Sequence, residues 1–221
     1  MSSMTPNGFL NAGKIAGKIM LLACILLPVV AGQTGVAEWG PVKTTRSGQI
    51  YHRSAGNLSF PWVMIVTTFD ATPARVHAIV TDYNHFAEFV PNVAESRVIW
   101  NEGDEQWIYH HLHFPGPVAD RVYLIKSSDK ASRPVENYYH VTWNLAARTF
   151  PDLDLSAGIK PDVFRGYWEI RPGEHANSTE ARYAVYSDPG GFIPGWLVGK
   201  MTDRYVQQVV EAIRERLARD K

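Results

Sequence analysis

The chain has 221 residues, with 22 Lys and Arg against 22 Asp and Glu, and one cysteine, Cys24. Such a balance gives no long-range attraction to nucleic acid, so we expect no nucleic-acid partner. Because Cys24 lies in the first 37 residues, a chain cut after them has no disulfide, thiolate nucleophile or thiolate metal site. All seven Trp follow residue 37, and this aromatic content suits a large core or a cavity wall.

The first 37 residues have the order of a secretory signal peptide. Lys14 and Lys18, their only charged residues, precede an uninterrupted apolar run, and small residues follow. Cleavage after Ala31 or Ala37 fits this pattern, and the run is shorter than the about 20 residues that span a bilayer. We therefore expect residues 38–221 to be one periplasmic or secreted domain. A retained N-terminal membrane anchor is the alternative.

The expected domain begins with strands and helices. A short strand is predicted at 49–52, and the β-branched apolar run at 62–69 (WVMIVTTF) predicts another. Thr72 and Pro73 then have the residue types of a helix N-cap and first helical position, and apolar residues follow at helical spacing. A short second helix carries Phe86.

The pattern from 94 to 187 predicts a meander of antiparallel strands, because hairpin-length turns rich in Gly and Pro separate them. The predicted strands are 95–100, 106–114, 121–128, 138–145, 165–171 and 180–187. Alternation in the last three of these strands defines one apolar face, which comprises Tyr139, Val141, Trp143, Trp168, Ile170, Tyr183 and Val185.

A long amphipathic helix is predicted from about Pro194 to Ala218. Met201 and Tyr205 begin an apolar stripe that repeats every four residues, and Val198, Val206 and Val210 widen it. A sheet and a helix that each have one apolar face bury those faces against each other. The predicted fold is therefore α+β and helix-grip, with a curved antiparallel β-sheet wrapped around a long C-terminal α-helix.

Three stretches, in the same order, resemble the START-like superfamily of lipid-transfer, polyketide-cyclase and coenzyme Q-binding domains. Residues 61–99 (PWVMIVTTFDATPARVHAIVTDYNHFAEFVPNVAESRVI) resemble its opening, and His113–Arg121 (HFPGPVADR) resembles the Pro-rich turn and Asp-Arg pair of START lipid-binding domains. Residues 188–197 (DPGGFIPGWL) resemble their entry into the terminal helix. The resemblance implies a cavity between sheet and helix that binds a lipid, sterol or quinone, and we expect no cofactor.

The candidate ligand-binding residues come from the apolar sheet face, the terminal helix and two polar positions. His110 shares a strand face with Leu112 and could bond a ligand hydroxyl or carbonyl. Arg121 could contact a ligand head group, but an ion pair with Asp120 that pins the turn is favoured. The predicted set is His110, Leu112, Arg121, Tyr139, Val141, Trp143, Trp168, Tyr183, Trp196, Val198, Met201 and Tyr205.

His111 and His113 project from one strand face, a spacing that metal sites use. The sequence supplies no third ligand nearby, so we expect ordinary polar histidines and no metal.

The mouth of the cavity is predicted at the turn 115–120, the loop 150–162 and the helix entry 190–196. The loop exposes apolar residues (PDLDL) that could form a lid or contact a membrane transiently. Alternatively, its leucines fold back onto the sheet.

Our first functional hypothesis is an exported, non-enzymatic carrier of an apolar small molecule. The chain has no Gly-x-Ser-x-Gly elbow, Walker loop or His-Glu-x-x-His motif. Residues 82–91 (DYNHFAEFVP) also resemble coenzyme Q-binding proteins, so a quinone-binding chaperone is one alternative. A cyclase or hydratase that uses the same cavity is another, because such an enzyme needs only a shaped pocket and one or two acid–base groups.

Overall fold

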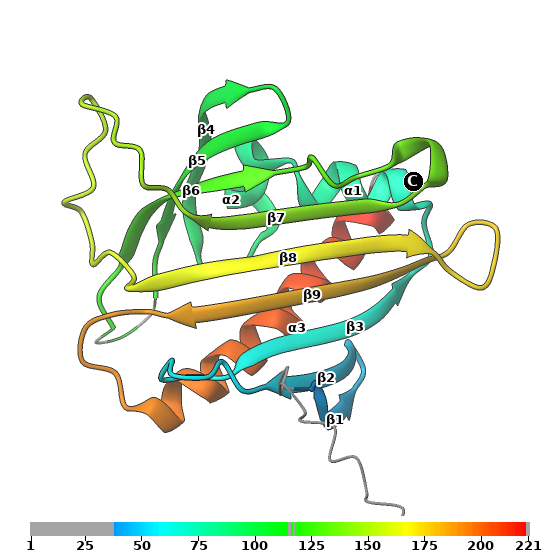
Figure 1. The fold of residues 1–221 in the computed structure, drawn as a ribbon, viewed down its shortest axis with the longest axis horizontal. Helices are drawn as coiled ribbons and strands as arrows, with labels where there is room; N and C mark the ends of the chain where they lie inside the picture. The colour runs from blue at the N-terminus through cyan, green and yellow to red at the C-terminus, as the bar shows by residue number, and fades with distance from the viewer. Residues whose placement is uncertain (1–37, 115, 117, 220–221) are drawn as a thin grey trace, which may run out of the picture. The chain divides into compact units, whose positions relative to one another are not determined.

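A computed structural model describes residues 38–114, 116 and 118–219 (Figure 1). The proposed signal peptide lies outside these residues. In the described part, nine strands form one antiparallel sheet in the order β1-β2-β3-β9-β8-β7-β6-β5-β4. The strands are β1 (Gly40–Thr45), β2 (Gly48–Arg53), β3 (Trp62–Phe69), β4 (Val93–Glu102), β5 (Glu105–Leu112), β6 (Arg121–Ser128), β7 (Tyr139–Leu145), β8 (Val163–Pro172) and β9 (Thr179–Asp188).

The helices are α1 (Pro73–Val80), α2 (Phe86–Phe89) and the terminal α3 (Gly195–Arg219), with short 3-10 turns at Tyr83–His85 and Pro134–Glu136. Thr72 caps α1 as predicted, because its hydroxyl accepts a hydrogen bond from the Arg75 backbone N–H. α1 and α2 lie on the connection from β3 to β4, the strand at one edge of the sheet.

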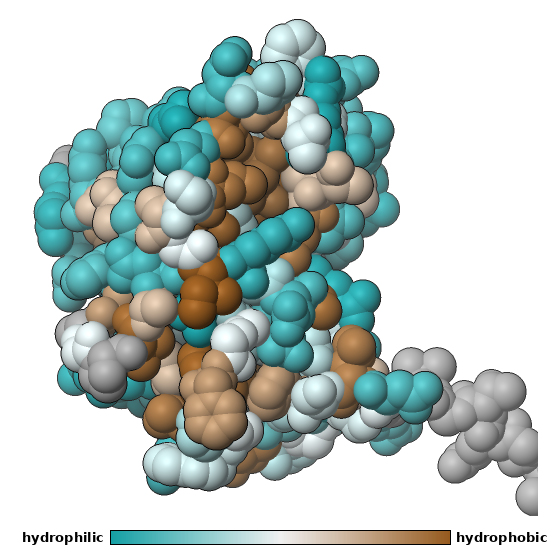
Figure 2. Space-filling model, turned by 90° about the vertical axis from the view of Figure 1, so that its left-hand side faces the viewer, coloured by the Kyte–Doolittle hydropathy of each residue, from teal (hydrophilic) through white to brown (hydrophobic). Residues whose placement is uncertain are grey.

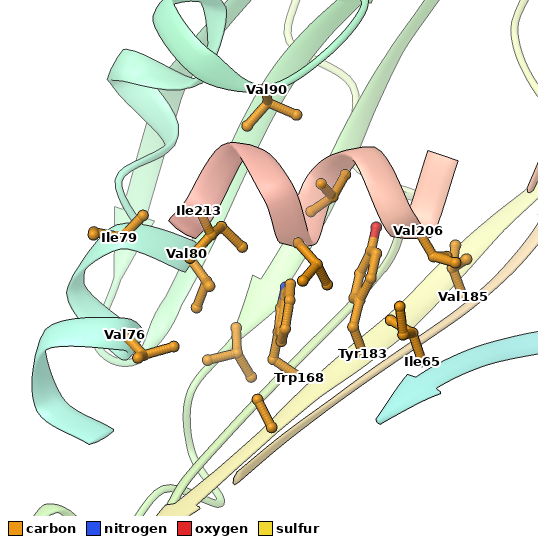
Figure 3. Packing of buried hydrophobic residues seen from close by; sticks show 14 of the residues in the cluster. Ile65, Val76, Ile79, Val80, Val90, Trp168, Tyr183, Val185, Val206 and Ile213 are labelled. Atoms are coloured by element: carbon orange, nitrogen blue, oxygen red, sulfur yellow. The ribbon is translucent and has the colours of Figure 1, made fainter. Parts of the chain in front are cut away.

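α3 packs across one face of the sheet and builds the main core. Figure 3 shows Trp168 and Tyr183 projecting from the sheet toward α3, which brings Val206 and Ile213 to them. The apolar stripe of the helix is buried as predicted, at Val198, Val206, Val209, Val210, Ile213 and Leu217. The helix-grip arrangement is confirmed. In the described part of the chain, no helix has the length and apolar character needed to cross a bilayer.

A smaller cluster forms on the opposite face of β5 and β6. Trp107, Tyr109, Val122 and Leu124 are buried there, and Phe150, Leu153 and Leu155 pack against them. The apolar residues of the 150–155 stretch therefore fold back onto the sheet. The lid and membrane-contact interpretation of that stretch is corrected, since its apolar side chains have a partner surface.

Candidate functional site

A cavity of about 450 Å³, here called the outer chamber, lies between the sheet and the first half of α3. Two of the three segments predicted to form the mouth contribute to its wall, through Val118 and Pro161. The predicted helix entry at 190–196 contributes no described residue, and the wall is completed on that side by Pro189 before it and by Val198 and Met201 on α3. Its volume lies within the about 300–1,000 Å³ typical of small-molecule sites. Figure 2 views the side with the 150–162 loop and the start of α3, where apolar residues gather between polar ones.

A second, smaller cavity of about 50 Å³, here called the inner chamber, lies between the sheet and α1, α2 and the middle of α3. Phe164 and Tyr205 line both chambers, so these two rings lie at the boundary between them. The wall of the inner chamber contains no Asp, Glu, Lys or Arg among the described residues. It comprises Ile79, Val80, Tyr83, Phe86, Phe89, Val90, His110, Ile125, Trp143, Phe164, Trp168, Tyr183, Tyr205, Val209 and Ile213.

His110 is the one histidine in the described wall of the inner chamber. Its side chain is buried between the rings of Phe86 and Tyr123, whose centroids lie 6.0 and 5.6 Å from the imidazole. Burial without a counter-charge lowers the pKa of His110 to about 4, so the ring is neutral at pH 7. Its Nε2 has no hydrogen-bond partner among the described residues.

Trp143 belongs to a row of rings on the sheet. Its indole lies 5.8 Å from the ring of Tyr183, which stacks on Trp168 at 4.4 Å. Gly166, opposite Trp143 on β8, makes room for the indole, because a Cβ at this position would collide with Trp143 and with the Ala184 carbonyl. Trp143 Nε1 is buried and likewise lacks a hydrogen-bond partner among the described residues.

The hydroxyl groups around the chamber boundary are also desolvated. Burial raises the pKa of Tyr205 to about 12 and raises the pKa values of Tyr123 and Tyr183 well above 10. All three are therefore neutral phenols at physiological pH.

Arg121 joins the turn before β6 to the entry of α3. Its guanidinium donates to the carbonyl oxygens of Pro189 at 2.6 Å, Gly190 at 3.0 Å and Ala119. Burial lowers its pKa, although the charge of Asp120 opposes this shift. The side chain is 3% exposed and lines the outer chamber, so Arg121 both holds this segment and presents a cation to the cavity.

The predicted ion pair between Asp120 and Arg121 is wrong. Asp120 instead accepts hydrogen bonds from His111 Nε2 at 2.7 Å and His113 Nδ1 at 2.9 Å, because successive strand residues point to opposite faces. These bonds hold the pKa of the Asp120 carboxyl below its usual value. Among the described residues, no group of three His, Cys, Asp or Glu side chains is arranged to hold a metal ion.

The structure brings most of the predicted ligand-binding residues to the chambers. His110, Trp143, Trp168 and Tyr183 line the inner chamber, Leu112, Arg121, Val198 and Met201 line the outer one, and Tyr205 lines both. Their binding roles remain predictions.

Three predicted residues lie elsewhere. Tyr139 and Val141 are buried on the same sheet face but line neither chamber, because α1 covers this end and His77 stacks on the Tyr139 ring at 4.3 Å. Trp196 is 67% exposed at the start of α3, where Lys200 lies over its ring.

Sequence reasoning missed the contributions of the early helices and of Phe164. The apolar spacing of α1 predicted a buried face, but not that Ile79 and Val80 would close the inner chamber. Phe164 lies next to Arg165, where the predicted strand began, so the alternation pattern was not extended to it.

The chain was compared with known proteins. Residues 69–214 match the model of the family described as polyketide cyclase / dehydrase and lipid transport. An uncharacterized protein of Pseudomonas aeruginosa is 25% identical over 168 residues, which cover 76% of this chain and 81% of that protein.

Two solved structures show the same fold. The STAR-related lipid transfer protein of Xanthomonas axonopodis superposes with a TM-score of 0.71 at 21% identity, covering 81% of this chain and 98% of that one. The Zhui aromatase/cyclase of Streptomyces sp. R1128 superposes with a TM-score of 0.53 at 12% identity, covering 72% and 93%. With the family match spanning most of the described sheet and α3, the chain belongs to the polyketide cyclase / dehydrase and lipid transport family, and its fold is that of the START-like domains.

Proposed function

We propose that the protein is an exported carrier that binds one lipid or similar apolar molecule non-covalently between the sheet and α3. The observation that carries this proposal is the outer chamber, whose volume of about 450 Å³ suits a small molecule and whose wall is mostly apolar. Its charged side chains, among the described residues, are Arg121 and Arg204. Such a wall favours an apolar body and tolerates a polar or anionic head group at its margin.

The proposal that the carrier is periplasmic or secreted is supported by the signal-peptide pattern of the first 37 residues. Transient membrane contact is supported by Phe192, which is fully exposed, and by the exposed Trp196. Both flank Pro194 at the entry to α3, beside the outer chamber. Apolar rings at such a rim can enter a lipid surface while a ligand is exchanged.

A cyclase or hydratase remains the second candidate, because the Zhui aromatase/cyclase has the same fold and His110 lines the inner chamber. General acid–base catalysis works best with a pKa near the working pH. The pKa of His110 is lowered to about 4 and that of Tyr205 is raised to about 12, so both groups stay neutral at pH 7. Because neither side chain changes its protonation state near pH 7, these pKa values favour a ligand-binding role for His110 and Tyr205 over a role in proton transfer. A quinone-binding chaperone would use the same chambers and differ only in its ligand.

The proposal is tested by lipid uptake. The purified protein, stripped of lipid, is incubated with vesicles of phosphatidylethanolamine and phosphatidylglycerol that contain a sterol and a quinone. It is then re-isolated, its bound lipid is extracted and its melting temperature is measured. We expect about one lipid per chain and a higher melting temperature, since a ligand that binds only the folded state stabilises it.

Met201→Asp places a carboxylate in the wall of the outer chamber and should abolish uptake while the fold persists. Ala218→Asp places the same group on an exposed part of α3 and should take up lipid like the wild type. Failure of the wild type to take up any lipid would contradict the carrier proposal. Normal uptake by folded Met201→Asp protein would show that the lipid binds elsewhere.

A further inference from the structure

Two side chains that line the same apolar chamber each carry a buried polar atom without a hydrogen-bond partner among the described residues. In the described part of the chain, three buried side-chain N or O atoms lack a hydrogen-bond partner: His110 Nε2, Trp143 Nε1 and Ser96 Oγ. His110 and Trp143 line the inner chamber and are each more than nine-tenths buried. Ser96 lies directly opposite His110 in the β4–β5 ladder. Buried polar atoms in folded proteins almost always have a partner, so this cluster points to an atom that arrives from outside the chain.

The chemistry of that atom follows from the two side chains. An indole N–H can only donate, so Trp143 requires an acceptor. A neutral imidazole nitrogen can donate or accept, according to its tautomer, so His110 can bond either a carbonyl or a hydroxyl oxygen.

The rest of the wall excludes a charged group. The inner chamber has no Lys or Arg in its described wall, and a carboxylate or phosphate there would be buried without a counter-charge. The two cations, Arg121 and Arg204, line the outer chamber instead. The inner chamber therefore suits a neutral oxygen and the outer chamber suits the rest of the molecule.

The two chambers adjoin at Phe164 and Tyr205, which line both. A molecule whose body fills the outer chamber can therefore extend a narrow end past these rings. The inner chamber, at about 50 Å³, has room for such an end.

We propose that the inner chamber binds the neutral oxygen end of the ligand, a carbonyl or hydroxyl that accepts a hydrogen bond from Trp143 Nε1 and bonds His110 Nε2. This inference rests on the proposed carrier function and narrows its ligand class. The ligand is an apolar molecule that carries a ketone, quinone or alcohol oxygen, and it enters the cavity with that oxygen first.

Matched probes test the inference. The affinity of the lipid-stripped protein is measured for cholesterol against 5α-cholestane, which lacks the hydroxyl, and for decylubiquinone against dodecylbenzene, which lacks the carbonyls. For at least one pair, we expect the oxygen-bearing member to bind about tenfold tighter, as one or two hydrogen bonds to buried, otherwise unpaired groups provide. His110→Phe and Trp143→Phe should each reduce the ratio of the two affinities to near one, because they weaken binding of the oxygen-bearing probe and leave the affinity for the oxygen-free probe unchanged.

Two control variants change the same residue types outside the chambers. Trp107→Phe alters the cluster on the opposite sheet face, and His140→Phe alters a side chain on the outer face of β7, so both should keep the wild-type preference. The inference would be overturned if the wild type bound both members of each pair with equal affinity. It would also be overturned if folded His110→Phe and Trp143→Phe proteins kept the wild-type preference. Either result would leave the carrier proposal standing. Binding of none of the four probes, together with no uptake from vesicles, would instead contradict the carrier proposal itself.

Discussion

The burial of His110 makes the stability of the folded protein depend on pH. Its imidazole is enclosed by Phe86 and Tyr123 and has no acidic neighbour that would favour the charged form. Its pKa is therefore about 4 in the folded protein, against about 6.5 for an unfolded chain. As the pH falls below 6.5, the unfolded state takes up a proton that the folded state refuses until the pH approaches 4.

This difference predicts a loss of stability in mild acid. Between pH 7 and pH 5, His110 should lower the free energy of unfolding by about 2 kcal/mol, and His110→Phe should remove that part of the decline. Urea unfolding of both proteins at the two pH values measures it. Other titrating groups contribute equally to both proteins. An equal fall in the free energy of unfolding of both proteins between pH 7 and pH 5 would therefore contradict the lowered pKa of His110.

At the level of residues, alternation along a strand predicted which side chains face the cavity but not what they bond. It placed His110 and Leu112 on one face and His111 and His113 on the other, as observed. It could not show that Asp120 would pair with the two histidines while Arg121 reached backbone carbonyls 68 and 69 residues away. Those partners depend on the return of the chain after β9, which no local pattern encodes.

α3 is fixed to the sheet by polar contacts as well as by its apolar stripe. Arg214 donates from Nη2 to Thr67 Oγ1 at 2.7 Å and to the Ser47 carbonyl at 3.2 Å. One turn earlier, Glu211 accepts from Arg46 at 2.8 Å and from Ser47 Oγ at 2.7 Å. These contacts tie the middle of the helix to the β1–β2 turn and so set the helix position above the chambers.

Removal of this anchor should therefore destabilise the fold. Arg214→Met keeps the length of the side chain but loses charge-assisted hydrogen bonds, and we expect the free energy of unfolding to fall by about 2 kcal/mol. Arg219→Met breaks an exposed pair with Glu215, the one interaction of this side chain among the described residues, and should change the free energy of unfolding by less than about 1 kcal/mol. Chemical denaturation of the three proteins tests this, and equal stability of all three would show that packing alone holds α3.

At the level of elements, strongly patterned segments were predicted well and weakly patterned ones were not. The strands at 62–69 and 121–128 and the terminal helix were found within a residue of their predicted bounds. β1 was missed, because its side chains are almost all exposed and show no apolar alternation. It is held instead by its backbone pairing with β2.

For the whole molecule, the layer arrangement could be predicted because the sheet and α3 each present one apolar face. The division of the interior into two chambers could not. It depends on where the rings of Phe164 and Tyr205 lie between β8 and α3, which is a property of side-chain packing. The ligand-binding role proposed for these chambers is likewise a property of the whole molecule, since β5–β9, α1, α2 and α3 all contribute to their walls.

The most direct test of an apolar ligand between the sheet and α3 is native mass spectrometry of the protein purified gently from cells that produce it. We predict a species heavier than the bare chain by one small molecule, which is released on unfolding and extracts into organic solvent. Its mass then identifies the lipid class. A protein that is found only at its bare mass, and whose melting temperature no lipid raises, would contradict the account.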